Sequence, residues 1–283
     1  MKKYLLFLVM VCFGFNAYCE GVVLSDTSVD GYDETTTVAE EPFNAPKSET
    51  TSVYTTSQSY SGVKSSLYND TSDPLFLTGD DKFLSDTYIN FYDKKIRFGQ
   101  YLDYGINKSL VLHANMLYQL DVSGHKENGF SATEFGGVYR INHGSENSRI
   151  ISDALFGLKL WGSSHVRTPE YADSSYYAGF RFGRQYTGLT LAGTIKSTWV
   201  FDGSRGLSYI DFIPEAYFRF KHDWRAGIGL DIRRSTNEHL LDNQEWLDLK
   251  LLRQYGNTQY VGRFDYEFES GEVQLGFDIK ILF

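Results

Sequence analysis

Cysteine is nearly absent from this chain of 283 residues, which has two, Cys12 and Cys19, both close to the N-terminus. If that stretch is removed on export, the rest of the chain has no thiol. Disulfides and cysteine-based metal or redox chemistry are then excluded. An oxidising compartment makes stray thiols a hazard, so this scarcity fits an exported protein.

Long hydrophobic runs are also lacking. After residue 19 no stretch approaches the ~18 uninterrupted apolar residues that a transmembrane helix needs, and the mean hydropathy of the chain is -0.33. Both features exclude a helical membrane protein and are typical of a soluble one. They do not exclude a membrane β-barrel, because half of each barrel strand faces a polar lumen.

The sequence also lacks an excess of basic residues. The formal net charge is -9, and residues 20–80 contain 11 acidic residues against Lys47 and Lys64, a net of -9 for that segment. Nucleic-acid binding requires a clustered positive surface, so this class of function is excluded.

The N-terminus has the pattern of a secretory signal peptide. Lys2 and Lys3 precede an apolar run from Tyr4 to Phe15, and small residues flank Tyr18 at the positions that a signal peptidase reads. We therefore expect residues 1–19 to be a cleaved signal peptide. A lipoprotein signal acylated at Cys19 is the alternative, although Tyr18 is bulky for the residue before the modified cysteine.

Residues 20–80 combine this acidity with 20 serines and threonines and few large apolar residues. Such a segment cannot bury enough apolar surface to offset its chain entropy, so we predict that it is disordered. The simplest interpretation is an exported linker. A plug in a lumen and a tether to another periplasmic component are sharper alternatives.

From about residue 84 the sequence alternates between apolar and polar residues with a period of two, the pattern of strands with one apolar face. Helical spacing would mix these sets on every face. The alternation predicts an all-β, transmembrane, antiparallel up-and-down β-barrel over residues 81–283. Its twelve or so strands are expected at 84–93, 96–106, 109–121, 130–142, 149–161, 173–185, 188–201, 206–220, 224–235, 244–254, 258–268 and 273–283. A soluble β-sandwich is the alternative architecture.

The connections support the barrel. With a periplasmic C-terminus, the longest predicted loops, 122–129, 162–172 and 236–243, all lie on the outer side. Short turns are expected at the periplasmic side. Long outer loops and short periplasmic turns are characteristic of outer-membrane barrels.

The last strand resembles the C-terminal signal by which the outer-membrane assembly machinery recognises its substrates. Its outward residues would be Val273, Leu275 and the signal positions Phe277, Ile279, Ile281 and Phe283. Residues 84–283 thus resemble the porin-like outer-membrane β-barrel proteins of bacteria. The resemblance implies a location in the bacterial outer membrane, with its lipids and the assembly machinery as partners.

A second similarity rests on the run from Gln100 to Ile106, followed by the apolar residues from Leu110 to Leu112. This pattern is similar to the outer-membrane family linked to the meta-pathway of phenol degradation. It does not identify a substrate.

In phase with the predicted strands, eleven basic and ten acidic residues face the lumen. The basic ones are Arg97, Arg140, Lys159, Arg181, Lys196, Arg219, Arg225, Arg233, Lys250, Arg263 and Lys280. The acidic ones are Asp103, Glu134, Asp153, Asp211, Glu215, Asp231, Asp248, Asp265, Glu267 and Asp278. A strongly anion-selective pore would have a clear basic excess, so near balance predicts cross-strand ion pairs in a narrow, partly occluded lumen.

These features favour a narrow channel or transporter for small polar or amphipathic solutes. A non-transporting structural or adhesive barrel, or a membrane anchor, is the alternative. A lipid-modifying barrel enzyme has less support: His113 points inward by phase, and the other five histidines fall in loops or turns. No cofactor or metal site is predicted, no catalytic residue is assigned, and the oligomeric state is not predicted.

Overall fold

The computed structural model describes residues 70–92, 94–124, 127–144, 150–160, 162, 173–201, 208–220, 223–236 and 243–283. The predicted signal peptide, residues 20–69 of the predicted disordered segment and parts of several loops lie outside these described residues. Within them, no helix has the length and apolar character needed to cross a bilayer.

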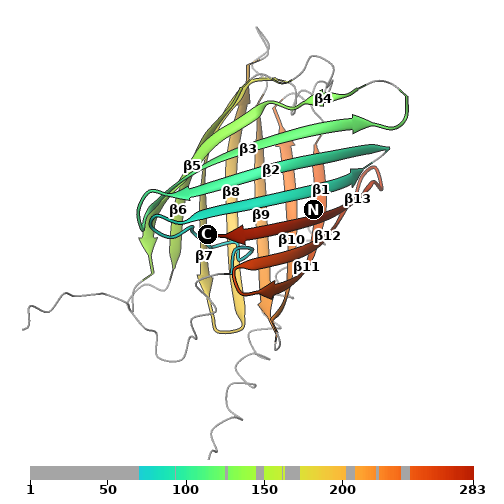
Figure 1. The fold of residues 1–283 in the computed structure, drawn as a ribbon. Coiled ribbons are helices and arrows are strands. Elements are labelled where there is room, and N and C mark those ends of the chain that lie inside the picture. The colour runs from blue at the N-terminus through green and yellow to red at the C-terminus, as the bar shows by residue number, and fades with distance from the viewer. Residues whose placement is uncertain are drawn as a thin grey trace, which may run out of the picture. The chain divides into compact units, whose positions relative to one another are not determined.

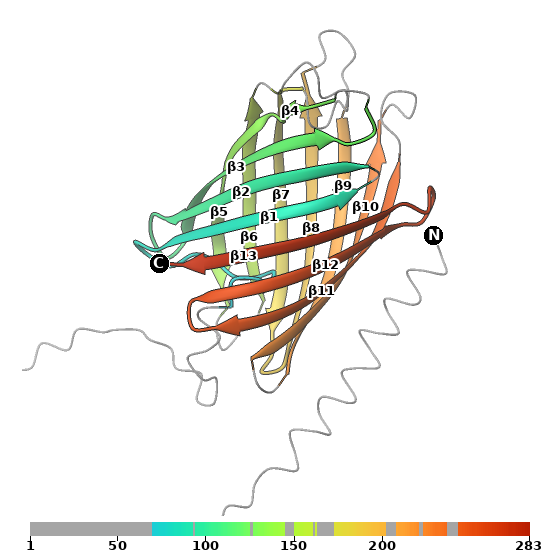
Figure 2. The same cartoon turned by 45° about the vertical axis from the view of Figure 1, so that its right-hand side comes forward.

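The described residues form a closed antiparallel β-barrel of twelve strands. The elements are β1 (Phe83–Tyr92), β2 (Lys95–Gly105), β3 (Leu110–Asp121), β4 (Gly129–Phe130), β5 (Thr133–His143), β6 (Ile151–Leu160), β7 (Ser175–Gln185), β8 (Leu189–Val200), β9 (Ser208–Arg219), β10 (Trp224–Ser235), β11 (Gln244–Tyr255), β12 (Thr258–Glu267) and β13 (Val273–Leu282). Neighbours in sequence pair with each other, and β1 pairs with β13 to close the sheet, as both views show (Figures 1 and 2). Closure removes the free edges that an open sheet exposes.

The prediction of a barrel with about twelve strands is confirmed, and each boundary lies within about two residues of its predicted position, with one exception. The predicted strand 130–142 is divided into β4 and β5. Tyr118 of β3 pairs with Phe130, but Asn115 pairs with Glu134, so the later strand has one residue more over this stretch. This is a β-bulge, which places both Ser131 and Ala132 in buried positions.

In the structure, the apolar residues of the alternating pattern are exposed and the polar residues are buried. Apolar side chains of the outer face are exposed, such as Phe180 and Leu275 with 61% and 52% of their surface, whereas Asp153 and Asp211 on the inner face are fully buried. A soluble protein would show the opposite arrangement. The pattern matches a barrel with lipid outside and polar groups inside.

The two ends of the barrel differ in their connections. We call the end with the C-terminus the turn end; its connections include the short turns 186–188 and 256–257. The opposite end, here the loop end, has the longest connections, 161–174 and 236–243. At the turn end the backbones of Phe83 and Phe283 exchange two hydrogen bonds, of 3.3 and 2.8 Å.

A proline interrupts the pairing between β9 and β10. The register runs from Arg225–Arg219 to Gly229–Glu215 and resumes at Ile232–Phe212, leaving out the pairs that would include Pro214. Proline has no N–H to donate to a ladder, which accounts for the gap. On its other side, Pro214 still lies opposite Gly193 of β8.

Candidate functional site: a lumen closed by an N-terminal plug

The segment from Asp70 to Lys82 lies at the turn end and enters the lumen, and we call it the plug. Asp70, Asp73, Leu75 and Thr78 are buried. Its first part turns on itself, since Asp73 N donates to Asp70 O (3.0 Å). Residues 70–80 therefore have a defined path, which differs from the disorder predicted through residue 80.

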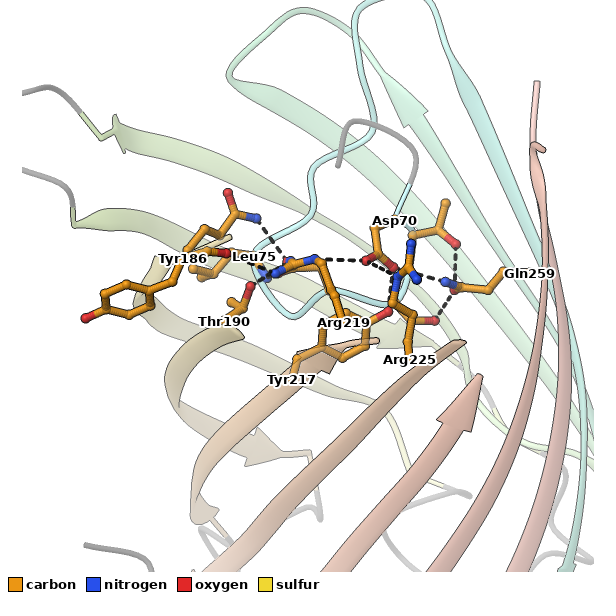
Figure 3. Close-up of polar contacts among 12 residues, drawn as sticks. Asp70, Leu75, Tyr186, Thr190, Tyr217, Arg219, Arg225 and Gln259 are labelled. Carbon is orange, nitrogen blue, oxygen red and sulfur yellow. Dashed lines mark hydrogen bonds and ion pairs between the residues drawn. The ribbon is translucent and has the colours of Figure 1, made fainter. Parts of the chain in front are cut away.

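Asp70 lies at the centre of a set of donors from the three strands β9, β10 and β12 (Figure 3). Its carboxylate accepts hydrogen bonds from Tyr217 Oη (2.5 Å), Gln259 Nε2 (3.0 Å), Arg219 Nε (3.2 Å) and Arg225 Nε (3.3 Å). Protein groups thus supply the hydrogen bonds that water would otherwise make to this carboxylate. This is what allows an acid to be buried at little cost.

Asp73 binds the other side of Arg219. Its Oδ2 contacts Arg219 Nη2 and accepts hydrogen bonds from Thr190 Oγ1 (2.7 Å) and Gln185 Nε2 (3.1 Å). In Figure 3 the Arg219 guanidinium lies between Asp70 and the side formed by Thr190 and Tyr186. Arg219 therefore connects the two plug carboxylates.

The next plug residues bind through their backbone carbonyls. Arg140 Nη2 donates to Leu75 O (2.6 Å), and Arg181 Nη2 donates to Phe76 O (3.4 Å). The same two arginines clamp Asp153, through Arg140 Nε (2.8 Å) and Arg181 Nη2 (2.6 Å). Asp153 thereby holds both guanidinium groups where they reach the plug.

A cavity of about 450 Å³ lies in the lumen beside the plug and is bordered by Ser72. The bulge residues Ser131 and Ala132 also border it. Its charged lining residues are Asp86, Arg97, Glu134, Lys159, Lys250, Arg263, Asp278 and Lys280. Cavities of this size accommodate small molecules, and the lining is dominated by hydrogen-bonding groups.

Most charges around the cavity are paired across strands. Arg263 donates to Asp278 (2.9 Å) and to Asn90 Oδ1 (2.7 Å), and Lys280 Nζ lies 3.5 Å from an Asp86 oxygen. Arg97 Nε donates to Gln119 Oε1 (3.1 Å). Such pairs fix long side chains that would otherwise extend across the space.

The remaining predicted site residues have the following positions. His113 Nε2 lies 2.9 Å from Tyr177 Oη and 3.4 Å from a Glu134 oxygen. Arg233 pairs with Asp211 (2.7 Å), and Lys250 with Glu215 (3.3 Å). Thr78 Oγ1 donates to Asp103 (3.3 Å) and Gln274 Nε2 donates to Asp265 (3.1 Å), and Asp231 lies in β10. Glu267 instead binds the turn after β12, accepting hydrogen bonds from the backbone N–H groups of Ser270 and Glu245.

The sequence did not single out Asp70, Asp73, Thr190 or Gln259 as site residues. The two polar wall residues follow the strand alternation and could have been added to the lumen list by phase. The two plug acids lie in a Ser/Thr-rich acidic stretch, where nothing in the local pattern separates them from the other acids.

The sequence matches no family model and no curated protein. Among solved structures, the NanC porin is similar at a TM-score of 0.55 and 8% identity, covering 70% of this chain and 98% of that one. An outer membrane channel from Pseudomonas putida F1 is similar at a TM-score of 0.53 and 12% identity, covering 73% and 97%. The chain has the fold of a bacterial outer-membrane β-barrel. At these identities the likeness to the porin and to the outer membrane channel extends to the fold alone.

Within the described residues, no group of three or more His, Cys, Asp or Glu side chains is placed to hold a metal ion. The arginine, lysine, carboxylate and tyrosine groups described above form hydrogen bonds and ion pairs in the lumen.

Proposed function

We propose that the protein is a narrow outer-membrane channel for small polar or amphipathic solutes, with the plug as its closed gate at the turn end. The observation that carries this proposal is the polar cavity beside the plug inside a closed barrel. An eight-stranded barrel can fill its interior with wall side chains alone, but a wider barrel leaves space inside. Here a separate segment of the chain closes one end.

Both ends of the chain would act in export and assembly. Residues 1–19 would direct export and be removed, residues 20–69 would precede the plug, and the last strand, ending in Phe283, would be read by the assembly machinery. In this orientation the turn end faces the periplasm. A solute would then enter from the loop end and leave past the plug.

The test is the conductance of the purified, refolded full-length chain in planar bilayers. Folding is checked separately, because a folded barrel migrates differently on gels before and after boiling. We expect small current steps that depend on salt concentration. Silent bilayers containing folded protein, both for the full chain and for a variant lacking residues 20–80, would contradict the channel.

A non-transporting barrel is the second candidate, and the tight fit of the plug favours it. Asp70 and Asp73 are both buried and together accept hydrogen bonds from six wall side chains. A permanent plug would stiffen the turn end and make the barrel an anchor. The full-length chain separates the two candidates, because a channel conducts with its plug present, whereas a permanently plugged barrel is silent until residues 20–80 are removed.

A further inference from the structure

Four arginines gather at the turn end, and most of the acid that faces them comes from the plug. Arg140 and Arg181 share the wall residue Asp153, whereas Arg219 and Arg225 pair with Asp70 and Asp73. Among the described residues, neither Arg219 nor Arg225 forms an ion pair with a wall carboxylate. Without the plug, the wall here would carry an uncompensated positive charge.

The donors around Arg219 form a complete carboxylate-binding site. Two guanidinium groups, the Tyr217 hydroxyl and the Gln259 amide converge on Asp70, and the Thr190 hydroxyl and the Gln185 amide reach Asp73. Both carboxylates meet at Arg219. We call this set of wall residues the Arg219 site. Planar guanidinium groups with flanking hydroxyl and amide donors are suited to carboxylate ligands.

The contacts between the plug and the wall are of a kind that a free ligand could replace. Its backbone forms a wall contact near residue 81, where Asp81 N donates to Gly105 O (3.0 Å). Between Asp70 and Thr78, each hydrogen bond described above between the plug and the wall involves a side chain of the plug or of the wall. Leu75 is the main buried apolar anchor. A competing carboxylate could therefore replace Asp70 and Asp73 without breaking a β-ladder.

We propose that the Arg219 site binds small dicarboxylates that pass through the lumen, and that Asp70 and Asp73 occupy it as a tethered competitor. This inference rests on the proposed function, since it names the class of solute. Ser72 lies between the two plug acids and borders the cavity, so the site and the solute chamber adjoin. A solute that binds Arg219 would displace the gate that closes its own exit.

The covalent attachment of Asp70 and Asp73 to the barrel determines how strongly a free dicarboxylate is expected to bind. A ligand attached to the same chain has an effective concentration in the millimolar range, so a free dicarboxylate must compete with it. Removing the two plug charges should strengthen binding of a free dicarboxylate at least about tenfold. Removing Arg219 should abolish that gain.

The experiment is isothermal titration calorimetry of succinate into the refolded full-length protein in detergent, with the neutral diamide succinamide as the matched ligand. The variants are wild type, D70N/D73N, and D70N/D73N with R219Q. D80N/D81N is the matched control: it removes two charges from the same segment, but both residues are exposed and neither contacts the Arg219 site. We expect D70N/D73N alone to bind succinate at least about tenfold more tightly than wild type.

Equal succinate affinity in wild type and D70N/D73N, or binding that persists with R219Q, would overturn the site. If D70N/D73N does not refold, D73N keeps the four donors on Asp70 and should show an intermediate gain; no gain in a folded D73N also counts against the site. Calorimetry needs no current through the barrel. Succinate binding in a silent barrel would refute the channel and keep the site, whereas conduction without succinate binding would refute the site alone.

Discussion

The ring of Tyr177 fills the space that Gly157 leaves empty on the neighbouring strand. A Cβ atom at position 157 would lie 2.5 Å from the ring of Tyr177, and one at Gly136 would lie 2.6 Å from its hydroxyl. The two glycines thus let Tyr177 lie flat against the inner wall, where its hydroxyl reaches His113. The ring narrows the lumen less than it would if it stood upright.

Replacement of Gly157 by alanine should therefore displace Tyr177 and destabilise the barrel by about 1–3 kcal/mol, the usual cost of overpacking. Urea unfolding of the refolded barrel in lipid vesicles measures this. Gly262→Ala is the matched control, because the nearest atom to its added Cβ would be 3.9 Å away. Equal stabilities of the two variants would show that the ring does not depend on the glycine.

Asp153 should be the most sensitive carboxylate in the lumen. It is fully buried between Arg140 and Arg181, and Asp153→Asn leaves both guanidinium groups without their counter-charge. Loss of one partner from a buried ion pair costs on the order of 3 kcal/mol or more. Asp86→Asn, which removes a single 3.5 Å contact to Lys280, should cost less in the same unfolding experiment.

Gly105→Ala should loosen the plug without touching the Arg219 site. A Cβ at Gly105 would lie 1.8 Å from the Gly79 carbonyl oxygen, so the plug backbone must move away from β2. We expect the conductance to rise toward that of the barrel lacking residues 20–80. Gly227→Ala, another glycine of the inner face with its nearest contact at 3.4 Å, should leave the conductance unchanged. If both variants conduct like wild type, the plug is not the gate.

Ala132→Trp should lower the conductance of the unplugged barrel, because position 132 is buried and borders the cavity. Its added volume falls within the proposed solute path. Leu158→Trp places the same side chain on the outer face of β6, where Leu158 has 47% of its surface exposed. Single-channel recordings of the two variants compare the inner and outer positions directly; equal currents would place the path elsewhere.

Phe283→Ala should separate assembly in cells from stability in lipid. The Phe283 ring is 67% exposed and its main contact is with Phe83, at a ring separation of 6.2 Å. Its two backbone hydrogen bonds to Phe83 survive the substitution. We expect unfolding in vesicles to change by less than about 1 kcal/mol, as for most surface positions. The amount of barrel assembled in the outer membrane should fall several-fold; unchanged assembly would exclude the predicted signal.

The strands could be predicted from sequence because each inner residue and its outer neighbour obey a strict period of two. The bulge at Ser131 could not be predicted in this way. The alternation stays intact on either side of the one extra residue, and what shifts is the pairing register with the neighbouring strand. The defined path of residues 70–80 could not be predicted either. Residues 70–80 have the composition of a disordered chain, and they become ordered because wall arginines supply the partners for Asp70 and Asp73.

The wall charges were predicted as a list but not as a network. Alternation places Arg219 and Arg225 on the inner face, and says nothing of what lies opposite them across the barrel. The near balance of inward charge suggested wall-to-wall pairs, which Arg263 and Asp278 form. The acidic partners of Arg219 and Arg225 come instead from a segment outside the strands, a long-range relationship that no local pattern encodes.

The gap in the ladder at Pro214 bears on how the turn end can move. Arg219 ends β9 and Arg225 follows the start of β10, so both belong to one hairpin. This hairpin is joined by two short ladders in place of one continuous ladder, with the interruption between them. Its turn-end half can therefore open as an independent unit, and amide hydrogen exchange should be faster there than in the uninterrupted hairpin of β11 and β12. Release of the plug would then begin as local fraying of two strands, with the rest of the barrel wall unchanged.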